Sequence, residues 1–381
     1  MTLPRSIPIA LMCMLQHASA TGCRAVLPLI ALALGASPAA AGALVATQAL
    51  APAVLSLPIG KLVARRGTRF GAGIGTALGG LAFLVMAALA SAWHAALPFV
   101  VAAAVGLGFA LTLVSVQREL GHCVDEGEAR AYDHFSLFVA ISGSAGPLLA
   151  GFCLSAFGAK GAAIGLAMLV AASITTMRWC GARWSPVPAQ PGPQDRAQAP
   201  AASSSLNRPA RVLLRAEVVI SLLWNATAML AILRSHDAGW SAAQGAAVLS
   251  VLGAGVAAAR IAGPWITHRA SDVALIRLSM AAAGLGVASF VVPLPWLAVC
   301  ALQFVVGVGL GVSLRPVLSE LHRRCDAEGY TGVLAIRQLL LNLCAVAGPA
   351  AMGLLVGAPW SGAVFAVLGA MAVLSAWAME V

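Results

Sequence analysis

The chain carries very little charge for its size. Charged residues make up 9% of its 381 residues and hydrophobic residues 60%, and the mean hydropathy is +0.92. A soluble domain of this length could not keep so much apolar surface in solution. The apolar runs lack the alternation of a β-barrel and often reach about 20 residues, the length that a helix needs to cross a bilayer. These features predict an all-α polytopic membrane protein.

The sequence also lacks the common signatures of catalysis, metal binding and redox chemistry. The seven His form no HExxH motif, and no Gly-x-Ser-x-Gly segment or nucleotide-binding loop is present. The eight Cys include no CxxC, and most lie in apolar runs, where a thiol packs as a small hydrophobic group. We therefore expect no enzyme, no cofactor, no disulfide framework and no metal site.

The formal net charge of +10 does not indicate a nucleic-acid partner, because the basic residues lie in short loops without a basic helix or an aromatic platform. Most of them fall on one side of the predicted topology: Arg5, the cluster from Lys61 to Arg69, Arg118, Arg130, the series from Arg178 to Arg211, Arg269, Arg323 and Arg324. Loops rich in Lys and Arg face the cytoplasm. We therefore expect a multi-pass, monomeric protein of the inner (plasma) membrane with both termini in the cytoplasm.

The apolar runs predict about twelve transmembrane helices. They lie near residues 7–34, 39–60, 70–91, 95–117, 134–156, 161–177, 212–233, 241–262, 273–293, 295–314, 332–356 and 361–379. Between the sixth and seventh runs the sequence is rich in Pro, Ser, Ala and Gln, which is typical of a flexible linker. We predict a six-helix bundle in residues 1–178, a cytoplasmic linker in 179–211 and a second six-helix bundle in 212–381.

The two halves contain an internal repeat. Val105-Gly106-Leu107-Gly108 is matched by Val306-Gly307-Val308-Gly309, an offset of 201 residues. Further along, Arg118-Glu119-Leu120 is matched by Ser319-Glu320-Leu321, and Gly146-Pro147 by Gly348-Pro349. An offset that holds over so much of the chain indicates two pseudo-symmetric halves of one fold.

A basic segment separates the second and third apolar runs. It reads Gly60-Lys61-Leu62-Val63-Ala64-Arg65-Arg66-Gly67-Thr68-Arg69 and has a weaker copy from Gly263 to Asp272. Through Gly60, Arg65, Gly67 and Arg69 it resembles the loop signature Gly-x-Leu-x-Asp-Arg-x-Gly-Arg-Lys/Arg of the major facilitator superfamily. The segment from Ser142 through Gly146-Pro147 to Ala150-Gly151 resembles that family's fifth-helix motif, which is common among exporters. The resemblance implies twelve helices in two halves that transport a small solute.

The chain departs from the family pattern at two positions. Ala64 replaces the acidic residue of the loop signature, which in the family helps to latch the cytoplasmic gate, so the latch is missing or another acid such as Glu119 or Asp133 supplies it. The fourth-helix Arg of many proton-driven drug exporters should fall near Ala102, which has no charge. The resemblance therefore does not extend to a standard drug/proton antiporter.

Arg24 is a cation inside the first apolar run. The ten apolar residues that follow it span about 15 Å of helix, so Arg24 should lie near the middle of a hydrocarbon core about 30 Å thick. A charge there is costly unless it faces the interior of the bundle. Arg24 is thus a candidate contact for an anionic or polar substrate, and the alternative is a structural Arg bonded to carbonyls of a neighbouring helix.

Polar residues share one face on the first helix of each half. These residues are His17, Thr21 and Arg24 in the first half and Glu217, Ser221 and Asn225 in the second. The resemblance implies that both helices line a central cavity, where the two faces would bind the substrate. Because Ser and Thr are also ordinary packing residues in membrane helices, a structural role is the alternative.

Three amides are further candidate substrate contacts, namely Gln48 in the second run and Gln338 and Asn342 in the eleventh. Gln338 and Asn342 share a helix face. Arg337 lies beside them near a predicted cytoplasmic helix end. We interpret it, together with Arg260, Arg277 and Arg315, as a side chain that snorkels to the membrane interface.

Coupling and gating residues are few. Glu217, Asp133 and His17 are the available proton carriers, since each could titrate when desolvated. The alternative for the two acids is that they are solvated helix caps. Gly146-Pro147 and Gly348-Pro349 should bend their helices, and Gly60, Arg65, Gly67 and Arg69 belong to the gate segment.

These observations favour a secondary transporter that moves a small organic solute by alternating access, with the lipid bilayer and the solute as its partners. Export is favoured through the Gly146-Pro147 motif alone. The alternatives are uptake of an organic anion attracted by Arg24 and, from another class, a membrane-embedded enzyme, which would need a nucleophile with its base, paired carboxylates or metal ligands. Coupling to protons stays open at this point.

Overall fold

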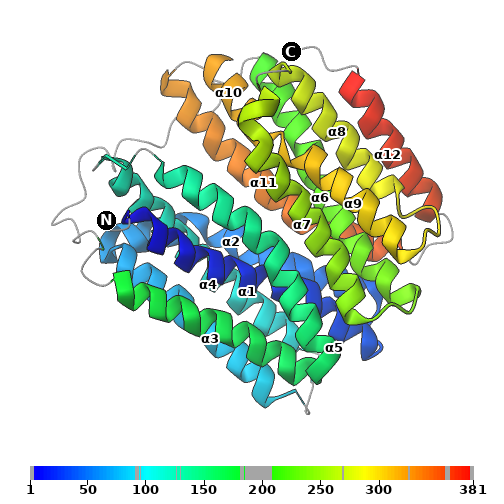
Figure 1. Ribbon diagram of the computed structural model, residues 1–381, viewed down its shortest axis with the longest axis horizontal. Coiled ribbons are helices and arrows are strands. Elements are labelled where there is room, and N and C mark those ends of the chain that lie inside the picture. The colour runs from blue at the N-terminus through cyan, green and yellow to red at the C-terminus, as the bar shows by residue number, and fades with distance from the viewer. Residues whose placement is uncertain are drawn as a thin grey trace. The chain divides into compact units, whose positions relative to one another are not determined.

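The computed structural model describes residues 4–90, 94, 96–125, 127–128, 130–180, 184, 208–267, 270–324, 327–356 and 361–377. Within these residues the chain is almost entirely helical and contains no strand (Figure 1). The helices are α1 (Ser6–Ala33), α2 (Pro38–Arg66), α3 (Thr68–Ala88), α4 (Leu97–Asp125), α5 (Ala131–Cys180), α6 (Arg208–Asp237), α7 (Ala242–Thr267), α8 (Asp272–Ala288), α9 (Trp296–Gly311), α10 (Leu314–Arg324), α11 (Ala327–Leu355) and α12 (Ser361–Trp377).

The fifth and sixth predicted helices are both present within α5. They meet at a kink at Gly158, which lies in the gap between the two predicted runs and whose φ of 69° only glycine adopts readily. The predicted helix at 295–314 ends early, at Gly311, and is followed by α10, a short helix that we did not predict. α10 is polar and amphipathic, so a search for long apolar runs passes over it.

Eight of the described helical segments are long and apolar enough to cross a membrane. α1 is 28 residues long but is not among them, because Gln16, His17 and Arg24 lower its hydropathy. α8 and α12 have 17 residues each. The chain is thus a multi-pass membrane protein, all-helical over the described residues, and α1 carries the predicted polar face of the first half.

The helices form two compact units. Unit 1 comprises the described residues within Met1–Ala36, Thr47–Gly192 and Gly239–Ser250, and unit 2 those within Ser37–Ala46, Pro193–Ala238 and Val251–Val381. Each unit therefore takes a short segment from the opposite half of the sequence. The start of α7 packs in unit 1, where a Cβ at Gly151 of α5 would overlap Ala246, and the start of α2 packs in unit 2, where Gly42 touches Gly353 of α11.

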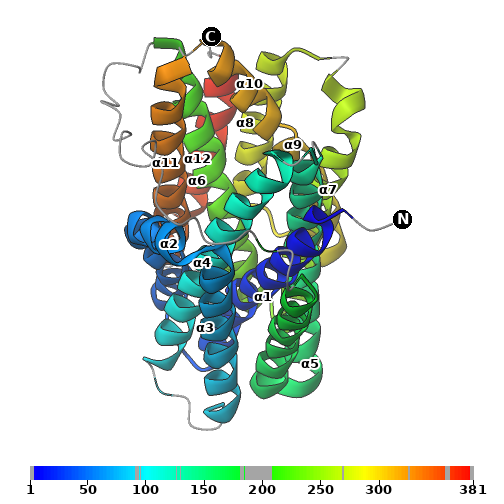
Figure 2. The same cartoon turned by 90° about the vertical axis from the view of Figure 1, so that its left-hand side faces the viewer.

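In unit 1, α1 lies against α5 and α4, and α3 lies against α4 (Figure 2). At the amino-terminal end of α1, apolar side chains from α1, α3, α4 and α5 form one buried cluster. It contains Ile9, Met12, Cys13, Ala72, Val116, Leu120, Cys123, Ala131 and Trp184. Trp184 follows the end of α5, so one residue of the predicted linker packs into the core of unit 1.

The first Val-Gly-x-Gly segment lies at two close helix crossings in unit 1. A Cβ at Gly106 of α4 would overlap the backbone of Gln48 on α2, and one at Gly108 would lie 2.6 Å from the carbonyl oxygen of Gly75 on α3. Neither crossing has room for a side chain. Both glycines are therefore required by the packing of α4.

The second copy of the segment makes the corresponding crossings in unit 2. A Cβ at Gly307 of α9 would overlap the backbone of Leu252 on α7, and one at Gly309 would overlap the side chain of Ala282 on α8. Small residues let the backbones of membrane helices approach closely. The repeat in the sequence is therefore also a repeat in helix packing.

Candidate functional site

The polar face of α1 is turned toward α5 within unit 1. His17 Nδ1 lies 2.6 Å from Ser142 Oγ, and the Thr21 hydroxyl lies 3.3 Å from the Ser142 carbonyl oxygen. Thr21 also donates to the carbonyl of His17 one turn earlier, at 2.9 Å. Both side chains of this face are half-buried. They connect two helices and leave part of their surface for another contact.

Glycine brings α1 and α5 together at this point. A Cβ on Gly146 would lie 2.9 Å from the carbonyl carbon of Ala18 and closer still to its oxygen and to Thr21 Oγ1. A Cβ on Gly22 would lie 2.8 Å from the carbonyl oxygen of Gly146. α5 continues through Pro147 without ending there. The Gly146-Pro147 motif therefore marks the closest approach of α5 to the polar face of α1.

Arg24 and Gln48 lie farther along the same unit. Arg24 is half-buried in the second half of α1, three residues beyond Thr21. Gln48 of α2 donates from Nε2 to the carbonyl oxygen of Ala20, 2.8 Å away. The amide that we predicted as a substrate contact thus links α2 to α1 on the section of α1 that carries the polar face.

In unit 2, Glu217 of α6 forms a two-point ion pair with Arg337 of α11. Arg337 Nε donates to Glu217 Oε2 at 2.7 Å, and the second guanidinium nitrogen contacts Oε1. The side chains are only 10% and 12% exposed, respectively. The interpretation of Arg337 as a snorkelling side chain is therefore wrong, because it reaches inward to a carboxylate. Of the other three arginines, Arg277 and Arg315 are exposed and Arg260 is half-buried.

The rest of the α6 polar face also meets α11. Asn225 Nδ2 donates to the carbonyl of Ser221 at 2.8 Å, and a Cβ on Gly348 of α11 would lie 3.0 Å from Asn225 Cβ. Cys344, one turn before Gly348, contacts the Val218 carbonyl at 3.6 Å. As at Gly146, the glycine of a Gly-Pro pair lies at the crossing with the first helix of its half, and α11 continues through Pro349.

The two amides of α11 bond to each other. Gln338 Nε2 lies 3.2 Å from Asn342 Oδ1, and Gln338 is exposed, so their predicted common face is present in the structure. Asp133 is also exposed, in the first turn of α5, where a negative charge is favoured by the helix dipole. The exposed position of Asp133 favours the solvated-cap interpretation, whereas the burial and pairing of Glu217 do not.

The gate segment is mostly helical. α2 runs through Gly60 and Arg65 to Arg66, and α3 begins at Thr68, so only Gly67 leaves the helical conformation, with φ 89° and ψ 160°. That backbone region is essentially restricted to glycine. Arg65 and Arg69 are exposed on either side of this break.

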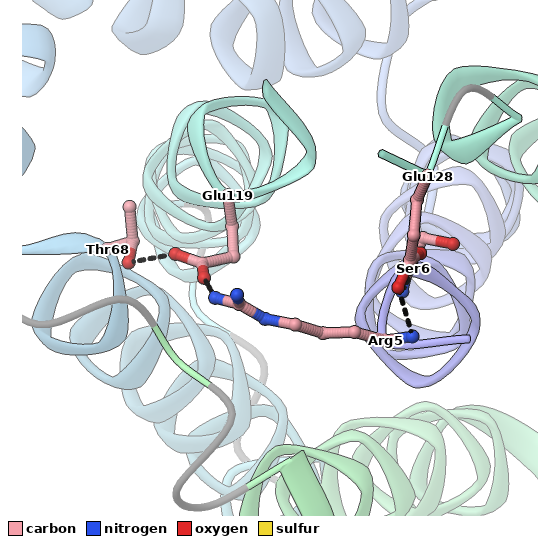
Figure 3. Close-up of polar contacts among 5 residues, drawn as sticks. All are labelled: Arg5, Ser6, Thr68, Glu119 and Glu128. Carbon is pink, nitrogen blue, oxygen red and sulfur yellow. Dashed lines mark hydrogen bonds and ion pairs between the residues drawn. The ribbon is translucent and has the colours of Figure 1, made fainter. Parts of the chain in front are cut away.

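Glu119 lies directly beside the gate segment. Its side chain is 0% exposed, accepts a hydrogen bond from the Thr68 hydroxyl at 2.7 Å, and forms an ion pair with Arg5 (Figure 3). Glu119 lies in α4 and Thr68 in the first turn of α3, and Arg5 is the residue before α1. Position 64 has no acid, but Glu119 of α4 binds Thr68 at the start of α3.

Glu128, in the turn between α4 and α5, accepts hydrogen bonds from the backbone N–H groups of Arg5 at 2.7 Å and Ser6 at 2.9 Å. Burial alone would raise the pKa of Glu128. The hydrogen bonds from the Ser6 hydroxyl and from both backbone groups, with the charge of Arg5, outweigh burial and hold the pKa below its usual range. Glu128 is therefore an ionised cap for the start of α1.

A comparison of the sequence with protein-family models gives a match over residues 9–329 to the model described as the Major Facilitator Superfamily. The chain belongs to the major facilitator superfamily. It is therefore a membrane transporter, as the loop signature and the repeat predicted. A comparison with curated protein sequences finds no match.

Solved structures share the fold of this superfamily member at low sequence identity. A mutant of the peptide transporter POT has 17% identity and a TM-score of 0.74, with 98% of this chain and 93% of that chain covered. A mutant of the nucleoside transporter NupG has 13% identity and a TM-score of 0.73, with coverage of 99% and 100%. A POT family transporter in complex with 5-aminolevulinic acid has 13% identity and a TM-score of 0.74, with coverage of 98% and 95%.

The superfamily signature did not indicate two of the contacts described above. Arg5 was expected only to mark the cytoplasmic side, and its partner Glu119 is 114 residues away. Ser142 was noted only as part of the fifth-helix motif. The one available signal was the match of Glu119 with Glu320 in the repeat. In the structure Glu320 also contacts a cation, Arg323, which in turn pairs with Asp272 at the start of α8.

Proposed function

We propose that this chain is a proton-coupled secondary transporter that exports a small organic solute across the inner membrane by alternating access. The observation that carries the proposal is the Glu217–Arg337 ion pair on the polar face of α6. A membrane helix rarely keeps a carboxylate in its interior without a use for it. Protonation of Glu217 would remove the charge that holds Arg337, and a polar or anionic group of the solute could then bind the Arg337 guanidinium.

The two polar faces supply the candidate solute contacts, each within its own unit. In unit 1 these are His17, Thr21, Arg24 and Gln48, and in unit 2 they are Ser221, Asn225, Gln338 and Asn342. Each face is half-buried or exposed in part, so it can both pack against a neighbouring helix and contact a solute. A solute bound to Arg337 would displace Glu217 and favour its protonation, so competition for Arg337 would link proton binding to solute binding, as coupling requires.

The test is transport by the purified chain in proteoliposomes under an imposed pH gradient, with a panel of labelled amines, amino acids, short peptides, nucleosides and organic anions. Glu217→Gln should abolish gradient-driven accumulation while solute exchange without a gradient continues, because the glutamine cannot release a proton. Glu320→Gln is the matched control, since Glu320 is a nearly buried, paired carboxylate of the same unit. Accumulation by Glu217→Gln equal to that of the unaltered chain would refute the coupling role.

Uptake of an organic anion is the second candidate, and Arg24, half-buried inside α1, favours it. A cation in that position attracts an anion strongly when water is excluded. Arg24→Gln should then raise the KM for anions and leave that for neutral solutes unchanged. The hypothesis of anion uptake fails if Arg24→Gln transports every tested anion as the unaltered chain does. A comparison of transport in inside-out and right-side-out vesicles distinguishes export from uptake.

A further inference from the structure

The residues that precede and begin α1 are fixed to three other elements of unit 1. The Arg5 guanidinium reaches across to the fully buried Glu119 of α4, which also holds Thr68 at the start of α3 (Figure 3). The Arg5 and Ser6 backbone N–H groups donate to Glu128 between α4 and α5. One short segment thus contacts α4 and the turn that leads into α5, and Glu119 connects it to α3.

A second contact lies on the α5 side of this segment. Ser6 Oγ is 3.3 Å from Nδ1 of His134, in the first turn of α5. The start of α1 has no capping side chain of its own, since Arg5 occupies the cap position without a side-chain bond to the helix. The first orphan N–H groups of α1 are satisfied instead by Glu128, from a distant part of the sequence.

These contacts determine the register of α1. α1 is one continuous helix from Ser6 to Ala33, and the rise from Arg5 to His17 corresponds to about 18 Å of helix. A shift of α1 by one residue would move the helix about 1.5 Å along its axis and turn it by about 100°. The 2.6 Å contact between His17 and Ser142 could not survive that shift.

We propose that Arg5 is a positioning residue for transport: its ion pair with buried Glu119 fixes the start of α1 and thereby holds the polar face at His17, Thr21 and Arg24 in register with α5. The proposal rests on the proposed role of that face in solute binding. It also assigns the function left open by Ala64, because Arg5, Thr68 and Glu119 join α1 to the gate segment without an acid at position 64.

The physical requirement for Arg5 is the burial of Glu119. Removal of Arg5 takes an ion-pair partner from a carboxylate that has no exposed surface, which is strongly unfavourable, so the loss of Arg5 alone should be more damaging than the loss of both charges. Arg323 in unit 2 provides a matched control. It pairs with Glu320 and Asp272, but its side chain is 57% exposed, and exposed pairs contribute little.

The first experiment is hydrogen–deuterium exchange of the full chain in lipid nanodiscs. Arg5→Gln should accelerate exchange in residues 6–12 at least about tenfold and in residues 17–24 more than about twofold, since both segments lose their fixed register. Arg5→Lys should restore most of the protection. Arg323→Gln should leave both segments unchanged. A change confined to residues 6–12 means local fraying only and overturns the proposal.

The double variant Arg5→Gln/Glu119→Gln keeps the test decisive if Arg5→Gln does not fold. It leaves no buried charge unpaired, so it should fold and still show faster exchange in residues 17–24. Unchanged exchange there refutes the proposal.

The second experiment is transport, which separates this inference from proton coupling. Arg5→Lys should raise the KM for the solute slightly and the double variant should raise it more. Dependence on the pH gradient should stay as in the unaltered chain. If the transport rate instead changes only as thermal stability changes, with the same KM in variants of equal stability, Arg5 has only a structural role. If the unaltered chain shows no proton coupling, the exchange experiment on residues 17–24 still tests Arg5.

Discussion

Replacement of Gly146 by Ala tests whether the α1–α5 crossing needs a glycine. The added Cβ would meet the Ala18 carbonyl and Thr21 Oγ1 well inside van der Waals contact, with little freedom for a backbone group to move away. Overpacking of this kind typically costs about 1–3 kcal/mol. The better helix propensity of Ala returns about 0.5–1 kcal/mol of that cost. We expect the cost of overpacking to exceed this gain, because the Ala18 carbonyl belongs to the backbone of α1.

Thermal unfolding of the purified chain in detergent measures the effect. A change of 1 kcal/mol shifts the midpoint by about 2–4 °C in a domain of this size, so Gly146→Ala should lower the midpoint of unit 1 by several degrees. Gly143→Ala, on the same helix, is the control. No atom lies within 4 Å of its added Cβ, so this variant should be neutral or slightly stabilising.

Gly348→Ala provides an intermediate case in unit 2. Its Cβ would lie 3.0 Å from Asn225 Cβ and from the Leu222 carbonyl oxygen, a contact that a shift of a few tenths of an ångström relieves. The predicted order of destabilisation is Gly146→Ala above Gly348→Ala above Gly143→Ala. Equal midpoints for Gly146→Ala and Gly143→Ala would refute the reasoning, since they differ only in what the new methyl group touches.

Three further predictions follow from single contacts. Gly67→Ala should destabilise the chain by about 1–3 kcal/mol, because a side chain is strongly disfavoured at its φ of 89° and ψ of 160°. Gly60→Ala, inside α2, is the control and should not destabilise the chain, so equal thermal midpoints for the two variants would contradict this prediction. Glu128, whose pKa is lowered from 4.5, should stabilise the start of α1 fully above about pH 4.5 and lose that effect as the pH falls through its lowered pKa. The protection of amides 6–9, measured as exchange relative to the intrinsic rate at each pH, should therefore fall on acidification in the unaltered chain and show no such fall in Glu128→Gln. Gln48→Leu should cost about 1 kcal/mol through the lost bond to Ala20, and an unchanged thermal midpoint would contradict it.

Much of the fold could be predicted from the sequence because hydropathy is a local property. Runs of apolar residues predicted most helices to within a few residues. The exception is α10, which is polar and therefore produces no apolar run. The close crossings at Gly108 and Gly309 became apparent only in the structure.

The candidate site was predicted only in part. Spacing along a helix showed that His17 and Thr21 share a face, because neighbours at i and i+4 depend on helix geometry alone. It could not show that this face meets Ser142, or that Glu217 meets Arg337. Those partners lie more than 100 residues apart, and no periodicity connects them.

The sequence by itself determined that this chain crosses a membrane, belongs to the major facilitator superfamily and is built from a repeat. Composition, run length and a ten-residue signature suffice for that. Only the tertiary structure decided which charges meet. The sequence shows that position 64 has no acid, but the packing of α4 beside the starts of α1 and α3 is what brings Glu119 to Arg5 and Thr68. Ion pairing acts over a few ångströms, so it depends on which helices are neighbours in space.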